Sequence, residues 1–210
     1  MIIGGIVLVN LNEGKLELLT DLNSVLVLVD YQPTMIKSVS SGDKTVIKNA
    51  AIFAAKAASI LDVPVVLSSI NPHSNGDVFP EITEIFPDQE VFARKIPSFD
   101  AFEDDKTFNA VKETNRNKIV VSGLWTSMCF TYTALHAIKE GYDVYGLIDA
   151  GGDSTKDAHN YSVKRMIQAG VIPITLESLV SEWMHDWNNP KAGELVENVY
   201  SNYGAMIGLK

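Results

Sequence analysis

The chain has little of several residue types, and each shortage excludes a class of protein. It has a single cysteine in 210 residues, which excludes an internal disulfide. It has 17 basic against 26 acidic residues and a net charge of −9, which disfavours nucleic acids and anionic membranes as partners. Its apolar runs are shorter than the roughly 20 residues that span a bilayer. Residues 1–10, "MIIGGIVLVN", lack the basic leader of a secretory signal. We therefore expect a soluble, cytoplasmic protein.

The apolar residues, 46% of the chain, follow an alternating strand and helix pattern. Short, nearly continuous apolar runs are typical of parallel strands covered on both faces. Runs with helical spacing separate them, so the sequence predicts an α/β fold with a doubly wound, mostly parallel six-stranded sheet and helices on both faces. The predicted strands are 24–30, 63–69, 89–95, 118–123, 142–149 and 171–176, and the helices between them are 43–61, 105–115, 127–141 and 156–170.

The two ends of the chain fit this pattern less well. We expect one domain over residues 1–210, with a hairpin at 1–20 added before the first core strand. A helix at 177–187 precedes a weakly patterned tail, 188–210, which packs on its own domain or on a neighbouring subunit. The apolar side chains of that tail are Val199, Tyr200, Tyr203, Met206 and Ile207.

Two reactive side chains follow predicted strands. Ligands of open parallel sheets bind beyond the carboxyl ends of the strands, where Asp30 in "VDYQP" and Cys129 in "GLWTSMCF" are expected. If a helix begins near Thr126, Cys129 lies in its first turn, where backbone N–H groups favour a thiolate. A buried apolar role for this lone cysteine is the alternative.

No histidine is placed beside Cys129 by the sequence. His136 follows seven residues later, on the order of 10 Å along the same helix, and a Cys–His pair has no support. His73 in "NPHSNG" lacks a second ligand at metal spacing. Asp149, at the end of another strand, is interpreted as a helix cap or turn former.

Together these residues resemble the isochorismatase-like cysteine hydrolase superfamily, and the YcaC-like branch most. The matching motifs are "VLVLVDYQ", "RKIPSFDAF", "VVSGLWTSMCFTYTALHAIKEGYDVY" and "DAGGDSTKDAHNYSVKRMIQAG", in order over about residues 24–187. The resemblance implies a catalytic triad of Asp30, Lys95 and Cys129. It also implies a cis peptide bond at Leu124–Trp125 and an oxyanion hole made by the backbone N–H groups of Trp125 and Cys129. Candidate residues for the substrate pocket are Gln32, Ile70, Phe99, Phe102 and Trp125.

The same resemblance limits the chemistry. Nicotinamidases of this superfamily bind a metal through an Asp-x-His motif, whereas this chain has Asn71 and His73, so we expect no metal and no cofactor. The triad implies hydrolysis of a small amide, carbamoyl or related acyl substrate through a thioester. YcaC-like relatives form multi-subunit rings, which implies a homo-oligomer such as a tetramer or octamer.

Two other functions are alternatives to a cysteine hydrolase. Phosphoryl transfer from Asp30 requires a second aspartate two residues later, where the chain has Gln32. A non-enzymatic binding or scaffold protein on the same fold is the main alternative, because a fold and its residues can outlast a function.

Overall fold

The computed structural model describes residues 17–95 and 97–208. The predicted hairpin at 1–20 therefore lies largely outside the described residues. A single sheet of six parallel strands, in the order β3-β2-β1-β4-β5-β6, forms the centre of the molecule. The strands are β1 (Ser24–Val29), β2 (Val65–Ile70), β3 (Val91–Arg94), β4 (Lys118–Gly123), β5 (Asp143–Leu147) and β6 (Ile172–Ile174). The predicted fold class is thus confirmed.

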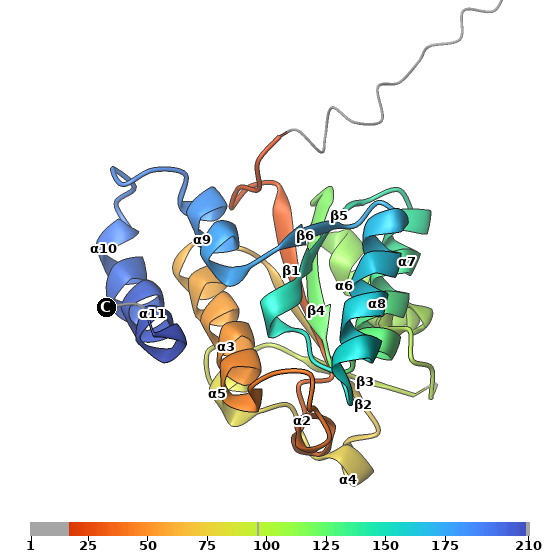
Figure 1. Cartoon of the computed structure of the whole chain (residues 1–210). Coiled ribbons are helices and arrows are strands. Elements are labelled where there is room, and N and C mark those ends of the chain that lie inside the picture. The colour runs from red at the N-terminus through yellow and green to blue at the C-terminus, as the bar shows by residue number, and fades with distance from the viewer. Residues whose placement is uncertain (1–16, 96, 209–210) are drawn as a thin grey trace, which may run out of the picture.

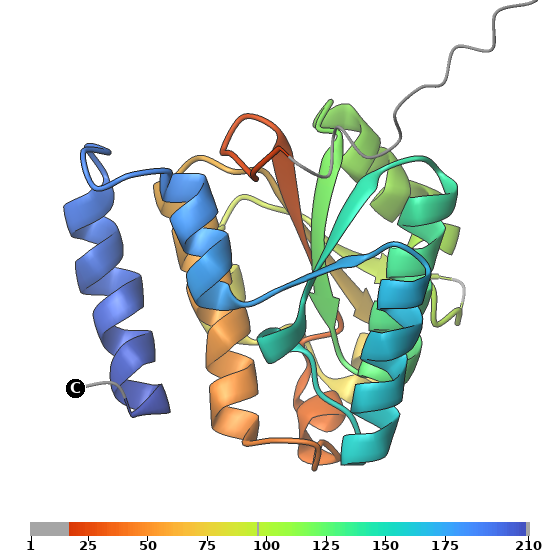
Figure 2. The same ribbon diagram turned by 45° about the horizontal axis from the view of Figure 1, so that its top comes forward.

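Helices cover both faces of this sheet (Figures 1 and 2). On one side lie α3 (Lys44–Ile60), α9 (Leu176–Met184), α10 (Ala192–Leu195), η4 (Val196–Tyr200) and α11 (Ser201–Ile207). On the other lie α6 (Asp105–Glu113), the π-helical turn η2 (Thr126–Phe130), α7 (Thr131–Lys139) and α8 (Lys156–Gln168). The short elements α2 (Pro33–Lys37), α4 (Pro72–Asn75), α5 (Pro80–Thr83), η1 (Ala101–Glu103) and η3 (Ile148–Ala150) lie in the connections.

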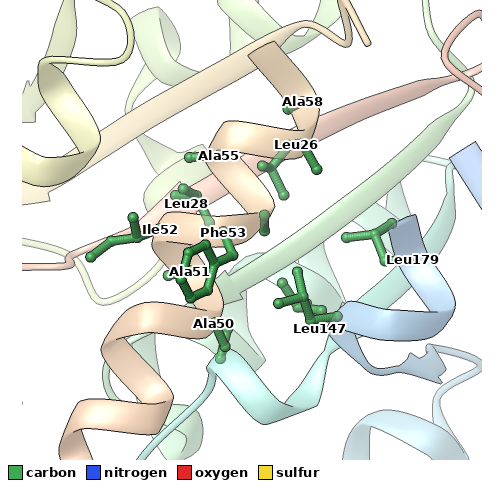
Figure 3. Packing of buried hydrophobic residues seen from close by; sticks show 14 of the residues in the cluster. Leu26, Leu28, Ala50, Ala51, Ile52, Phe53, Ala55, Ala58, Leu147 and Leu179 are labelled. Carbon is green, nitrogen blue, oxygen red and sulfur yellow. The ribbon is translucent and has the colours of Figure 1, made fainter. Parts of the chain in front are cut away.

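Strand β1 shows how the sequence builds two cores. Its side chains alternate between the faces of the sheet, so Leu26 and Leu28 join one hydrophobic cluster and Val25, Val27 and Val29 join the other. All six residues of β1 are buried, which explains its continuous apolar run. Figure 3 shows Leu26 and Leu28 facing α3, whose alanines allow the helix to lie close to the sheet.

The C-terminal tail folds back onto its own chain. Elements η4 and α11 contact α3, and they bury Val199 and Tyr203. Ile207 remains 40% exposed. Part of the tail therefore packs on the chain's own domain, and part of its outer surface is apolar. No helix in the described part of the chain is both long and apolar enough to cross a membrane.

The strand order fixes where a site can form. β1 leads towards one edge through β2 and β3, and β4 leads towards the other through β5 and β6. The direction of winding therefore reverses between β1 and β4, and a crevice opens beyond their carboxyl ends at such a reversal. Val29 of β1 pairs with Gly123 of β4 at this point.

Candidate active site

Asp30 is the first residue after β1 and is completely buried. Its φ of 61° lies in the left-handed region, which aspartate tolerates better than most residues. Its backbone N–H donates to the Ser68 carbonyl at 2.9 Å, which fixes the chain end against β2. The end of β4 lies close to the end of β1, because Gly123 has no side chain. A Cβ at this position would lie 2.7 Å from the Val29 carbonyl oxygen. The carboxylate therefore points from a rigid turn at the reversal point.

Arg94, the last residue of β3, holds this carboxylate with two hydrogen bonds. Nη1 donates to Asp30 Oδ1 at 2.9 Å and Nη2 donates to Oδ2 at 2.7 Å. Nη1 also donates to Ser68 Oγ at 2.9 Å, and Nε donates to the Ser98 carbonyl at 3.2 Å. Both charged side chains are 0% exposed. Such a paired geometry is the one in which a buried ion pair is tolerated, because each charge has a partner.

The predicted position of Lys95 beside Asp30 is wrong. Lys95 is exposed and lies just after the end of β3, and Arg94 takes the place next to the carboxylate. Successive side chains of a strand point to opposite faces, so only one of two adjacent cations reaches the site. The sequence did contain a signal for Arg94: it ends the run "VFAR", where a buried arginine needs an acidic partner.

Cys129 lies in η2, which runs directly into α7, and it is 1% exposed. Arg94 Nη2 is 3.9 Å from its Sγ, and the Asp30 side chain is close enough to raise the pKa of the thiol. The structure therefore brings Asp30, Arg94 and Cys129 together, and it leaves Lys95 outside this group. The alternative of a cysteine packed only among aliphatic side chains is contradicted by these contacts.

The protonation states of this group follow from its burial. Burial raises the pKa of the Cys129 thiol, the Asp30 carboxylate raises it further, and Arg94 opposes both effects. Burial also raises the pKa of Asp30, while the charge and hydrogen bonds of Arg94 lower it in part. The raised pKa keeps Cys129 as a thiol, so its sulfur becomes nucleophilic only when a base removes the proton.

A second set of polar groups holds the turn that carries Cys129. Asp153, 1% exposed, accepts a hydrogen bond from the backbone N–H of Ser127 at 2.7 Å. Thr126 donates its backbone N–H to the Gly152 carbonyl, and its hydroxyl is 2.9 Å from His159 Nδ1. Burial lowers the pKa of His159. Sequence reasoning missed both residues, because His159 reaches η2 through the packing of α8, and Asp153 lies in the connection before that helix.

The peptide bond between Leu124 and Trp125 is cis, at the position that the family resemblance implies. Trp125 caps η2, and its indole Nε1 donates to the Met35 carbonyl at 2.9 Å. Within the described residues, its backbone N–H has no hydrogen-bond partner. That N–H is therefore free to bind a ligand oxygen next to Cys129.

A small cavity of about 190 Å³ opens onto Cys129. Of the five predicted pocket residues, Ile70, Phe99 and Trp125 line it, together with Met35, Asn75 and Cys129. Gln32 instead holds the cavity wall from behind: its amide accepts from the Ile70 N–H and donates to the Ile70 and Gly76 carbonyls. Phe102 is buried against Phe108 and does not line the cavity. The prediction of these two as pocket residues is wrong.

A wider groove of about 730 Å³ lies beyond Phe99, which lines both spaces. In it, His136 Nδ1 is 2.7 Å from Asp100 Oδ2, so this histidine is engaged away from Cys129. The groove holds none of Asp30, Arg94 and Cys129, and it offers no nucleophile with an adjacent base. We therefore place the chemistry in the smaller cavity.

Three further polar residues behave as caps or surface groups. Asp149 accepts the Leu176 N–H at 2.9 Å and the Tyr203 hydroxyl at 2.9 Å, which agrees with its interpretation as a helix cap. Asn71 and His73 are exposed. Among residues 17–95 and 97–208, no cluster of three or more His, Cys, Asp or Glu side chains could hold a metal ion.

The protein resembles known proteins over most of its length. A model of the isochorismatase domain matches residues 24–178. "Probable hydrolase YcaC" of Escherichia coli (strain K12) is 28% identical over 182 residues, covering 86% of each chain. The crystal structure of the YcaC gene product of E. coli, described as an octameric hydrolase of unknown specificity, has a TM-score of 0.84 and covers 91% of this chain and 95% of that one.

A second solved structure, YcaC of Pseudomonas aeruginosa with hexane-2,5-diol and covalent acrylamide, is 25% identical. Its TM-score is also 0.84, and it covers 91% of this chain and 96% of its own. The matched domain spans every strand of the sheet together with Asp30, Arg94 and Cys129. This chain therefore belongs to the isochorismatase family.

Proposed function

We propose that the protein is a cysteine hydrolase that cleaves the C–N bond of a small amide, carbamoyl or related compound without a metal. The observation that carries this proposal is the contact of three buried side chains: Asp30 with Arg94 at 2.7 Å, and both with Cys129. A nucleophile beside a base that is itself oriented by a third group is the arrangement that covalent catalysis requires. The name of the E. coli relative, a hydrolase, supports the same reaction class.

In the proposed mechanism Cys129 attacks the substrate carbonyl. The thiol proton passes to the Asp30 carboxylate as the C–S bond forms, and the carbonyl electron pair moves to oxygen. The backbone N–H groups of Trp125 and Cys129 bind this oxyanion, which is the proposed role of the free Trp125 N–H. When the oxyanion collapses the C–N bond breaks, Asp30 returns its proton to the nitrogen, and ammonia or an amine leaves.

Water then completes the reaction. Asp30 takes a proton from the attacking water, the C–O bond forms and the C–S bond breaks, and the sulfur regains a proton as the carboxylic acid product leaves. Arg94 keeps Asp30 in place in both steps. Since arginine stays protonated throughout, its part is electrostatic and it transfers no proton. The raised pKa of Asp30 suits a group that must both accept and return a proton.

The proposal is tested by screening small amides and carbamates for ammonia release, with detection of an acyl adduct by mass spectrometry. The chain has one cysteine, so an adduct reports Cys129 without ambiguity. We expect Cys129→Ala to abolish turnover and the adduct while circular dichroism shows an unchanged fold. Full activity in this variant, or magnesium-dependent phosphatase activity in its place, would refute the proposal. An adduct without turnover would instead favour a binding protein on this fold.

We also propose that the protein forms homo-oligomers in the cytoplasm. The octameric state described for E. coli YcaC supports assembly. Large apolar side chains on the surface, Leu22 and Trp187 among them, supply groups that a neighbouring subunit can cover. Light scattering at several concentrations tests this, and a strictly monomeric protein would contradict it.

A further inference from the structure

The described residues that line the 190 Å³ cavity include no ionised side chain, which limits what can bind there. Four of the six lining residues are Met35, Ile70, Phe99 and Trp125, and the other two are Asn75 and Cys129. The ion pair of Asp30 and Arg94 has no exposed surface and is neutral as a unit. A charged ligand would lose its hydration in this cavity without gaining a partner of opposite charge.

The hydrogen-bonding groups of the cavity further limit which ligands can bind. The indole N–H of Trp125 is already committed to the Met35 carbonyl. The Asn75 side chain donates through Nδ2 to the Ile70 carbonyl at 2.8 Å, and this bond sets the orientation of the amide. Asn75 Oδ1 has no hydrogen-bond partner among the described residues. Apart from the thiol, Asn75 is therefore the one described lining side chain with free hydrogen-bonding positions: Oδ1 can accept, and the second Nδ2 hydrogen can donate.

Building on the proposed hydrolase function, we propose that Asn75 determines specificity by accepting the N–H of a small, neutral amide whose apolar part fills the cavity. A cavity of about 150 Å³ holds benzene, so an apolar group of roughly that size fits beside Cys129. An ester of the same shape lacks the N–H and leaves Oδ1 unpaired. A charged amide of the same shape meets only apolar walls.

The local structure allows Asn75 to be changed without loss of the cavity wall. Replacement by leucine removes Oδ1 and also the bond to the Ile70 carbonyl. That carbonyl keeps a donor, because Gln32 Nε2 binds it at 3.1 Å. Asn202 provides a matched control: its Nδ2 also donates to a carbonyl five residues earlier, that of Glu197 at 2.8 Å, and it is exposed far along the chain in α11.

Two alkylating reagents test the inference without any turnover. Iodoacetamide is a small neutral amide and iodoacetate is its anionic counterpart; with each, the sulfur displaces iodide, a C–S bond forms and the thiol proton is lost to base. We expect Cys129 to react with iodoacetamide at least about tenfold faster than with iodoacetate, after each rate is divided by that of a free thiol. Asn75→Leu should slow iodoacetamide by about 10- to 100-fold, as expected for one lost hydrogen bond to a buried group, and leave iodoacetate unchanged. Asn202→Leu should alter neither rate.

Turnover supplies the second measurement. Propionamide and glycinamide have the same shape, but the amino group of glycinamide, with a pKa near 8, is charged at about pH 6.5. We expect kcat/KM to favour propionamide, and Asn75→Leu to lower it for propionamide but not for methyl propionate. Equal normalised rates for the two reagents, or an equal loss for amide and ester, would overturn the inference. Selective alkylation without hydrolysis of any amide would uphold the role of Asn75 and refute the hydrolase function.

Discussion

Two aspartates lie just beyond the carboxyl ends of strands of the same sheet, and they differ in what surrounds them. Asp30 follows β1 and is bound by the Arg94 guanidinium and the Cys129 thiol. Asp149 follows β5 and is bound by a backbone N–H at the start of α9 and by the Tyr203 hydroxyl. Burial raises the pKa of both carboxyl groups. The position at a strand end and the raised pKa are therefore shared, and they do not distinguish a catalytic group from a structural one.

The difference lies in the partners. Each group bound to Asp149 belongs to the fold itself, because the backbone N–H and the Tyr203 hydroxyl join α9 and α11 to the sheet. Asp30 contacts a thiol that lines a cavity. A perturbed carboxyl group indicates function only when one of its partners can itself react with a ligand.

The largest effect should come from removing the charge of each aspartate in turn. Asp30→Asn cannot accept the thiol proton and should lower kcat by about 10²–10⁴-fold, the range for loss of a general base. Asp149→Asn should leave kcat close to that of the wild type, because Asp149 contacts neither the thiol nor the cavity. Steady-state kinetics on the best amide from the screen checks both. An equal loss of kcat in the two variants would show that the different partners of Asp30 and Asp149 do not determine which aspartate takes part in the reaction.

A smaller effect should separate the two adjacent cations at the end of β3, Arg94 and Lys95. Arg94→Lys keeps the charge but cannot bind both carboxylate oxygens in parallel, and we expect kcat to fall by roughly tenfold. Lys95→Met should have no effect, because Lys95 is exposed. Kinetics of both variants against wild type tests the assignment, and a loss confined to the Lys95 variant would restore the residue implied by the family.

The smallest effect concerns Asp149 and appears in stability. Tyr203→Phe removes one hydrogen bond to the carboxylate and should lower the free energy of unfolding by about 1.5 kcal/mol at neutral pH. That bond favours the ionised form, so its contribution is present above the pKa of Asp149 and disappears as the pH falls through it. Since burial raises this pKa, the loss should begin above the usual carboxyl range. Urea unfolding at several pH values measures it, and a difference independent of pH would contradict this account.

Much of the fold was predictable because the strands are buried on both faces. The runs at 24–30 and 118–123 correspond to β1 and β4 nearly residue for residue, since continuous burial leaves a continuous apolar signal. The placement of Asp30 and Cys129 followed from these strand ends. Segments 89–95 and 142–149 were predicted with longer bounds than β3 and β5 have.

The remainder of the site depends on side-chain direction and on loops. The sequence offers two adjacent cations, and which one faces Asp30 depends on the register of β3, which is set by its pairing with β2. Asn75 and Met35 line the cavity from short helices whose positions no periodic pattern encodes. Phe102 was predicted to line the pocket, and it is buried in a hydrophobic core cluster instead.

The Gln32 side chain has a consequence for redesign of the enzyme. Its side-chain amide binds the backbone of Ile70 and Gly76. The backbone N–H of Gln32 donates to the Asp30 carbonyl at 2.8 Å. One residue thus ties the segment bearing Asn75 to the turn bearing Asp30. Engineering that exchanges the length or backbone of segment 71–76 would disturb the turn bearing Asp30 as well, whereas point changes to lining side chains leave this tie intact. New substrates are therefore best sought by substituting single wall residues while Gln32 is retained.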